Sequence, residues 1–247
     1  MFEGIDHSVA LVHAVLEGNS PGRVFVDRSQ SPSSAYVILD GAFHYMAGDP
    51  SNREFNDAMI ASLFDEVLSG PEAQELVLFA FNDAWRQELD ALLGPHGAKR
   101  IRRKTFAFNS LTFQAHAGWR DRLPEGGCVR RIDEELAAED SDYASLVDPR
   151  TKRFGVCVIV DDVIASVCTA VAVGAGEVEI DIHTSETYRR HGHALRAACA
   201  FIEQAQARGL RPNWSCWPER EASCALARKL GFVDGLDVPA HFWMTGM

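Results

Sequence analysis

One stretch of this chain, EVEIDIHTSETYRRHGHA at residues 177–194, concentrates the side chains that could do chemistry. Its first half alternates as a strand does, and one face of that strand carries Glu177, Glu179, Asp181 and His183. A basic turn follows at residues 189–193, and a helical pattern begins directly after it. The strand carboxylates could accept a proton, and the turn could hold an anion, because a helix start leaves backbone N–H groups unpaired.

The basic turn predicts a pyrophosphate site. Gly192 permits a tight backbone path and close approach of a ligand, and Arg189 and Arg190 can add charge-assisted bonds to phosphate oxygens. A solvated turn with surface arginines is the competing interpretation. A nucleotide P-loop is excluded because GxxxxGK[ST] is absent, and a dinucleotide-binding fold is disfavoured because GxGxxG is absent.

Three histidines near this turn raise the question of a metal. His191 and His193 offer only two ligands, with no cysteine or carboxylate at a useful spacing, so no metal site is expected. His183 shares a strand face with Glu179 and is an alternative general base. The six cysteines form no CxxC pair, and four lie in apolar periodic segments, where reduced cysteine behaves as a small hydrophobe, so a cytoplasmic location is expected.

Composition limits the partners. The chain has 247 residues, of which 47% are apolar and 24% charged, and its net charge is −11. Such an acidic chain does not favour nucleic-acid binding and suits small cationic substrates such as amines. No apolar run approaches the roughly 20 residues of a membrane span, and the start lacks the basic region of a secretory signal, so no membrane partner is expected.

The N-terminal half predicts mixed elements. We expect a first helix around Val9–Leu16, strands at 24–26, 36–39 and 75–81, and helices at 52–68 and 83–93. The basic segment KRIRRKTFAFNSLTF, residues 99–113, predicts a pair of strands. The text WRDRLPEGG, residues 119–127, is the best candidate for a domain boundary.

The C-terminal half positions the basic turn. We expect a hairpin over 153–173 that turns at Asp161-Asp162, a second turn at 174–176, and the strand quoted above. The helix after the turn is expected to stop at Gly209, and a strand follows at 212–217. A last helix over about 219–230 ends at Gly231, and the segment 241–247 could add a strand.

These residues resemble a known family. Arg189-x-x-Gly192-x-Ala194 looks like the acetyl-CoA signature of the GNAT N-acyltransferase superfamily, and ALARKLGF, residues 225–232, resembles the end of the family's downstream helix. The run from the strand to KLGF, together with GRVFVD and PSSAYVILDGAFHYMAGD near the N-terminus, is similar to the bacterial subfamily that includes zwittermicin A acetyltransferase.

The resemblance implies an α/β fold with a mixed, mostly antiparallel sheet. The sheet would split at the acetyl-CoA site, between the strands around Ile182 and Ser215, and an N-terminal α/β region (residues 1–122) would pack on a GNAT domain (residues 123–247). Acetyl-CoA, the acyl-donor cosubstrate, would be held by Ile182, His183, Thr184, Arg189, Arg190, His191, Gly192, His193 and Ala194.

The resemblance also implies an N-acetyltransferase acting on the amine of a small molecule by direct attack on the thioester. Glu179 aligns best with the family's strand carboxylate and is the first choice of base, with Glu177 second. The position where many members have a tyrosine that protonates the thiolate is Ala227, which leaves Ser223 as the nearby hydroxyl. The missing tyrosine keeps open a non-catalytic acyl-CoA-binding or sensing protein. Expected partners are the amine acceptor and, as an open alternative, a second copy of the chain in a homodimer.

Overall fold

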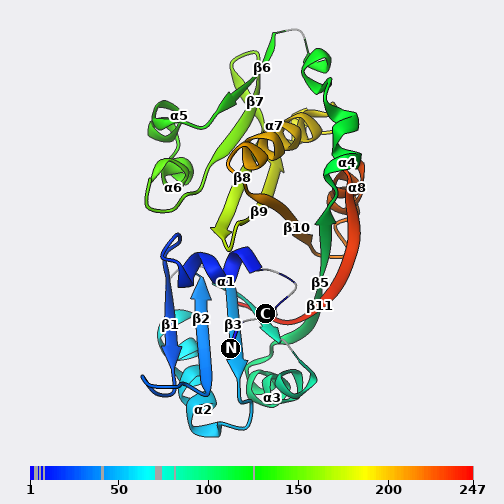
Figure 1. Cartoon of the computed structure of the whole chain (residues 1–247). Helices are drawn as coiled ribbons and strands as arrows, with labels where there is room; N and C mark the ends of the chain where they lie inside the picture. Colours follow the sequence, from blue (N-terminus) through cyan, green and yellow to red (C-terminus); the bar gives the residue numbers. More distant parts are fainter. Residues whose placement is uncertain are drawn as a thin grey trace. The chain divides into compact units, whose positions relative to one another are not determined.

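The structure, a computed structural model, describes residues 1–2, 5, 7, 9–39, 42–69, 74–80, 82–124 and 126–246, except the side chains of Ala80 and Arg122. It divides into two compact units (Figure 1). Unit 1 comprises Met1–His7, Pro21–Arg103 and Asp237–Met247, and unit 2 comprises Ser8–Ser20 and Lys104–Leu236. Strands β5 (Lys99–Phe108) and β11 (Phe232–Met244) each contribute residues to both units.

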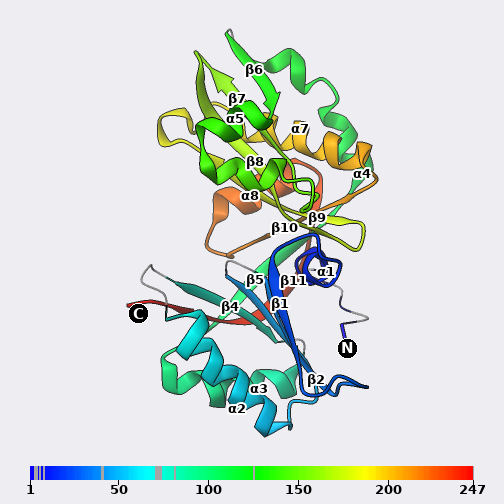
Figure 2. The ribbon, with the colours of Figure 1, turned by 90° about the vertical axis from the view of Figure 1, so that its left-hand side faces the viewer.

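Unit 1 is a sheet with helices on one face. Its strands are β1 (Gly22–Val26), β2 (Ser34–Leu39), β3 (Phe43–Gly48) and β4 (Glu75–Ala80), and the sheet order is β1-β2-β3-β4-β11. Only the β3–β4 pair is parallel among the pairs described there. Helix α2 (Arg53–Ser62), which continues as a π-helical turn Leu63–Val67, and helix α3 (Asp83–Leu93) pack on this sheet (Figure 2).

Local sequence explains where these helices begin. The side chain of Asn52 accepts a hydrogen bond from the Phe55 N–H, and that of Asn82 accepts one from the Trp85 N–H at 2.8 Å. Each asparagine thereby satisfies a backbone donor that the first helical turn leaves unpaired. Trp85 is then buried in the core of unit 1.

Unit 2 contains the predicted strand and basic turn. Its elements are α1 (Val9–Leu16), α4 (Ser110–Phe113), β6 (Gly127–Arg131), α5 (Glu134–Glu139), α6 (Ala144–Val147), β7 (Gly155–Val160), β8 (Val163–Gly174), β9 (Glu177–Thr184), α7 (His193–Ala207), β10 (Arg211–Cys216) and α8 (Glu221–Lys229). The described residues also form short 3₁₀ turns, at Gly94–His96, Gln114–His116, Trp119–Arg122, Ser141–Tyr143 and Glu186–Tyr188. The strand order β5-β10-β9-β8-β7-β6 continues that of β11, so the described strands form one mixed, mostly antiparallel sheet, as predicted.

Different helices pack on the two faces of the unit 2 sheet. Helix α7 packs on the face that carries Val156, Cys168 and Ile180. The opposite face carries Cys157 and Val167 against α5 and α6. Because Gly174 and Ala172 lie directly opposite Glu177 and Glu179 in the β8–β9 register, helix α1, which contacts Gly174, covers the same face as those carboxylates.

Turn chemistry accounts for the hairpins. Asp161 and Asp162 have φ angles of 48° and 62°, which is the left-handed pair that a tight two-residue hairpin requires, and the predicted turn position is confirmed. Helix α7 ends before Gly209, whose φ is 71°, and α8 ends before Gly231, whose φ is 93°.

The basic segment 99–113 is one strand, not the predicted pair. β5 continues unbroken from Lys99 to Phe108, and Asn109 then caps the short helix α4 by accepting the N–H groups of Leu111 and Thr112. An asparagine that caps a helix was misread as part of a second strand's alternation. In the middle of the sheet, β5 has a hydrogen-bonded strand on each side.

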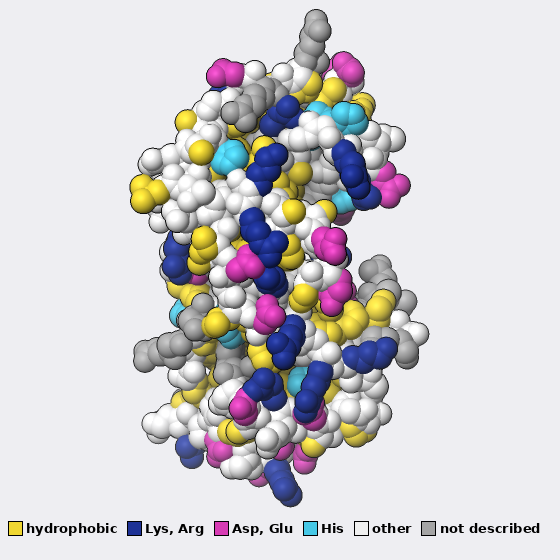
Figure 3. Space-filling model, turned by 90° about the vertical axis from the view of Figure 1, so that its right-hand side faces the viewer, with side chains coloured by type: hydrophobic (Ala, Val, Ile, Leu, Met, Phe, Trp, Pro, Cys, Tyr) yellow, Lys and Arg dark blue, Asp and Glu magenta, His cyan; other side chains and the backbone are white. Residues whose placement is uncertain are grey.

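Acidic partners compensate the charges of β5. Arg100 binds Asp90, Arg102 lies 4.0 Å from Asp237, and Lys104 lies 2.8 Å from Asp234. Figure 3, which views the side on which β5 is drawn in Figure 1, shows Lys and Arg side chains interspersed with Asp and Glu. The basic run is therefore a ladder of ion pairs rather than an uncompensated positive surface.

The boundary at residue 122 stays a prediction, and the two compact units interleave along the chain. Helix α1 joins unit 2, and the end of β11 joins unit 1.

No helix among the described residues is long and apolar enough to cross a membrane.

Candidate functional site

The two candidate bases on β9 are both buried. Glu177 is 7% exposed and Glu179 is 4% exposed, whereas Asp181 and His183 on the same face are exposed. A buried carboxylate costs free energy unless other groups hydrogen-bond to it, so the partners of each glutamate define its role.

Glu177 is held by two neighbours on β10. Its carboxylate forms an ion pair with Arg211 and accepts a hydrogen bond from the side-chain amide of Asn213. Because both carboxylate oxygens are engaged by donors on the adjacent strand, Glu177 joins β9 to β10.

Glu179 has a different environment. Its Oε1 accepts a hydrogen bond of 2.5 Å from the hydroxyl of Ser215. A serine hydroxyl is a neutral donor, and this bond orients the carboxylate. Glu179 therefore lies buried and oriented, next to the exposed Asp181 on the same strand face.

The sheet splits beside Glu179. The parallel register between β9 and β10 places Arg211 opposite Glu177 and Asn213 opposite Glu179, and among the described residues it extends no further. From Trp214 onward β10 pairs with β5 instead, while residues 180–184 of β9 stay paired with β8. The predicted split between Ile182 and Ser215 is confirmed, and it exposes one backbone edge of β9 at Ile182–Thr184.

The basic turn has the backbone that the glycine suggested. Gly192 has a φ of 79° and directly precedes α7, and Arg190 is also left-handed, with a φ of 66°. Within the part of the chain that the structure describes, no side chain caps the first turn of α7. The N–H groups at the start of the helix are consequently available to an anion.

Side chains around the turn fix its shape. Arg189 Nε donates to the carbonyl oxygen of Thr184 at 3.3 Å, and Arg196 donates to the carbonyl oxygen of His191 at 2.7 Å. A Cβ atom at Gly192 would lie 3.0 Å from the Arg196 guanidinium. The loop is thus closed over the helix start by Arg196, with little room for a side chain at position 192.

Two buried nitrogens at this turn have no hydrogen-bond partner among the described residues, namely His193 Nδ1 and Arg196 Nε. Burial lowers the pKa of His193, and the nearby charges of Arg196 and His191 lower it further. Arg196 Nε is a buried donor next to the N–H groups of the helix start, a set of donors that suits an anionic ligand.

Ser223 lies on α8, and its hydroxyl is hydrogen-bonded to a side chain of the core. Its Oγ accepts a hydrogen bond of 3.1 Å from the indole N–H of Trp214. Indole only donates, so the hydroxyl hydrogen of Ser223 is left for another acceptor. Ala227, one turn later, is fully buried and offers no polar atom from its side chain.

Sequence reasoning missed the partners of the two glutamates. Alternation in PNWSCW places Asn213 and Ser215 on one face of β10, which was a usable signal. Their assignment to Glu177 and Glu179 required the parallel register, which strand alternation alone does not define.

Comparison with known proteins establishes the family. The sequence model described as GNAT acetyltransferase matches residues 1–237, and the chain belongs to this N-acetyltransferase family. It is 30% identical over 230 residues to YdfB of Bacillus subtilis (strain 168), an uncharacterized N-acetyltransferase, covering 90% of this chain and 85% of that protein.

Solved structures share the fold. A GCN5-related N-acetyltransferase-like protein from Streptococcus suis 89/1591 superposes with a TM-score of 0.70 at 24% identity, covering 96% of this chain and 94% of its own. A GCN5-related N-acetyltransferase from Kribbella flavida gives a TM-score of 0.61 at 17% identity and covers 98% of each chain. The fold class predicted from the sequence is therefore confirmed.

Proposed function

We propose that this GNAT protein transfers an acetyl group from acetyl-CoA to the amine of a small molecule, by direct attack of the amine on the thioester. The observation that carries the proposal is the buried Glu179 at the point where β9 and β10 separate, oriented by Ser215. We also propose that, within the GNAT family, this protein belongs to the bacterial subfamily that includes zwittermicin A acetyltransferase.

Two parts of the chain suit the cosubstrate. The backbone edge of β9 at residues 182–184 can pair with the amides of a pantetheine arm, and the N–H groups of residues 190–194 can hold a pyrophosphate. Arg189 and Arg190 add positive charge next to the turn. When bound, acetyl-CoA supplies an activated acyl group as a thioester.

Three proton and charge requirements follow from the reaction class. An amine is mostly protonated near neutral pH, and Glu179 can accept its proton directly or through water. The backbone N–H groups on the open edge of β9 can stabilise negative charge that develops on the carbonyl oxygen. Ser223 keeps its hydroxyl hydrogen and is the candidate to protonate the departing thiolate.

The acceptor is proposed to be cationic before it reacts. Asp181 lies exposed beside Glu179 on the same face of β9, so the approach to the proposed base carries negative charge. An ammonium ion is attracted to such a surface, and it becomes a nucleophile only after Glu179 removes its proton.

Glu179→Gln tests the proposal. The change keeps the shape and the bond to Ser215 but removes basicity, so kcat should fall about a hundredfold or more while acetyl-CoA affinity stays unchanged. The defect should shrink as pH rises, because more of the amine is already deprotonated. Coenzyme A release with a panel of amines gives the rate, and Glu177→Gln is the matched control.

A normal kcat in Glu179→Gln across the pH range would assign the base to Glu177, His183 or water. The alternative function, a non-catalytic acyl-CoA-binding or sensing protein, is favoured by the buried Ala227. It would be supported by tight acetyl-CoA binding with no release of coenzyme A in the presence of any amine tested.

A further inference from the structure

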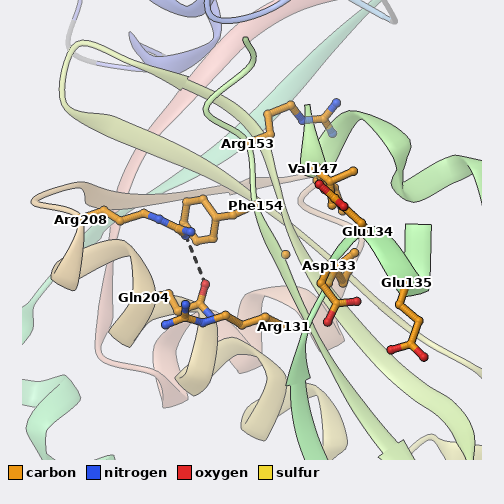
Figure 4. A pocket seen from close by; sticks show the side chains of 12 residues that line it. Arg131, Asp133, Glu134, Glu135, Val147, Arg153, Phe154, Gln204 and Arg208 are labelled. Carbon is orange, nitrogen blue, oxygen red and sulfur yellow. Dashed lines mark hydrogen bonds between the residues drawn. The ribbon is translucent and has the colours of Figure 1, made fainter. Parts of the chain in front are cut away.

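A second site is suggested by a hollow of about 550 Å³ in unit 2. It is lined by the end of β6, by α5 and α6, by the start of β7 and by the last turn of α7 (Figure 4). The basic turn lies at the other end of α7, and Gln204 is eleven positions after His193, which corresponds to roughly 16 Å along a helix. The hollow is thus distinct from the proposed acetyl-CoA site.

Two arginines extend into this hollow from different elements. The Arg208 guanidinium carbon lies 3.8 Å from the centre of the Phe154 ring, and its NH1 donates to Gln204 Oε1 at 3.2 Å. Arg131 extends from β6 towards Gln204 (Figure 4). Among the described residues, neither arginine has a carboxylate within ion-pair distance, so their charges are not compensated there.

The described carboxylates that line this hollow do not form ion pairs with the two arginines. Asp133, Glu134 and Glu135 also line the hollow, and none of them is ion-paired with Arg131 or Arg208 among the described residues. Asp133 and Glu135 instead bind Arg130, whose side chain lies on the opposite face of β6 from that of Arg131. Asp133 in addition accepts the Leu136 N–H at the start of α5, which together with Arg130 lowers its pKa. Asp133 and Glu135 are thus already ion-paired with Arg130.

The two arginines repel each other. Burial lowers the pKa of Arg208, and the charge of Arg131 lowers it further. Like charges held side by side are unfavourable, and an anion between them would remove the repulsion while accepting hydrogen bonds from two guanidinium groups.

An adjoining hollow of about 360 Å³ is mainly apolar. It shares Arg131 and Gln204 with the first. Its apolar lining is Trp119, Val129, Val156, Ala200 and Ala207, and Arg120 and Glu203 complete it. Its one carboxylate, Glu203, accepts the Trp119 indole N–H at 2.8 Å and binds Arg120. This hollow therefore offers an apolar surface directly beside the unpaired arginines.

We propose that the two hollows form one binding site for a small phosphate monoester with an apolar body. The phosphate would lie between Arg131 and Arg208, next to the Gln204 amide, and the apolar body would contact Trp119 and Ala200. The oxygens of a phosphate dianion can accept from two guanidinium groups at once, which a single carboxylate does less completely. The site is independent of the acetyl-transfer proposal.

Phenyl phosphate is the probe. Trp119 provides a local signal, because its indole N–H resonance in a ¹⁵N–¹H spectrum can be assigned from its loss in Trp119→Phe. We expect a saturable shift of this resonance with phenyl phosphate, about tenfold weaker binding of inorganic phosphate, and no response to benzyl alcohol, which has the ring but no charge.

Charge-removing variants test the two arginines. Arg131→Gln and Arg208→Gln should each weaken phenyl phosphate binding about tenfold or more, since each removes a charge-assisted contact. The control Arg150→Gln removes an exposed arginine that is paired with Asp148 and should bind normally. Melting curves would show that all variants are folded.

Gly192→Asp identifies where the probe binds. Binding that survives Arg131→Gln and Arg208→Gln but is lost in Gly192→Asp would place the phosphate at the basic turn and overturn the proposal. Absence of any Trp119 response up to about 10 mM probe would overturn it too. Equal affinities for phenyl phosphate and inorganic phosphate would refute the role of the apolar hollow.

Discussion

Gly174 determines how closely helix α1 approaches the sheet of unit 2. A Cβ atom at this position would lie 2.4 Å from the Ala14 nitrogen and 2.6 Å from the His13 carbonyl carbon. Both obstacles are helix backbone, which cannot rotate away as a side chain can. The substitution Gly174→Ala should therefore displace α1 by about 1 Å to restore ordinary contact distances.

The cost can be worked out from the contacts. Overpacking a close contact costs about 1–3 kcal/mol. The displacement also strains the hydrogen bond from Asn19 to the Val173 carbonyl, 3.0 Å, and the one from the Ala175 N–H to Glu17, 2.8 Å, each worth about 0.5–1.5 kcal/mol. We expect a loss of about 2–6 kcal/mol in unfolding free energy and a fall of about 5–20 °C in Tm.

Thermal and urea unfolding followed by circular dichroism would measure this loss. Gly118→Ala is the control, because Gly118 has a φ of −89° and a ψ of 22°, and the nearest atom to its would-be Cβ is an Asp121 carboxylate oxygen at the ordinary contact distance of 3.5 Å. That variant should be neutral or stabilised by up to about 1 kcal/mol. A Gly174→Ala protein within about 0.5 kcal/mol of the parent would show that α1 is not fixed by this contact.

Three further predictions concern single side chains. Glu177→Gln should cost about 1–3 kcal/mol of stability, because Arg211 loses its charged partner, yet leave kcat within about threefold, as enzyme assays alongside Glu179→Gln would show. Burial lowers the pKa of His44 from 6.5 to about 3. The stability that its neutral ring contributes is therefore present above pH 6.5 and is lost as the pH falls. Urea unfolding should show a loss of about 2 kcal/mol by pH 5, and the His44→Gln variant should lack this loss. Gly192→Asp should weaken acetyl-CoA binding about tenfold or more by calorimetry, whereas Gly192→Asn, which tolerates a positive φ and carries no charge, should weaken it less; equal losses would attribute the effect to backbone strain.

The parts of the fold that followed from the sequence are those specified by nearby residues. The Asp161-Asp162 turn, the stop of α7 at Gly209 and the basic turn before α7 each depend on a backbone preference of one or two residues. Helix α3 matches its prediction at both ends, Asp83 and Leu93, because an asparagine cap precedes an amphipathic run.

Features that depend on distant residues were not accessible in this way. Helix α1 was grouped with the N-terminal region, but it packs on β8 because Gly174, about 160 residues away, leaves room for its backbone. Likewise, nothing in the segment 99–113 indicates that Asn109 would cap a helix. The alternation of side chains around Asn109 is equally typical of a strand.

The difference between Glu177 and Glu179 is of the same kind. On the strand alone the two carboxylates are equivalent, two residues apart on one face. The parallel register with β10 places Arg211 and Asn213 at Glu177, and it places Ser215 within reach of Glu179 where the strands part. Arg211 holds the first carboxylate in an ion pair, whereas the second accepts a hydrogen bond from the hydroxyl of Ser215. The same divergence of strands that opens the β9 edge therefore also distinguishes the proposed base from its neighbour.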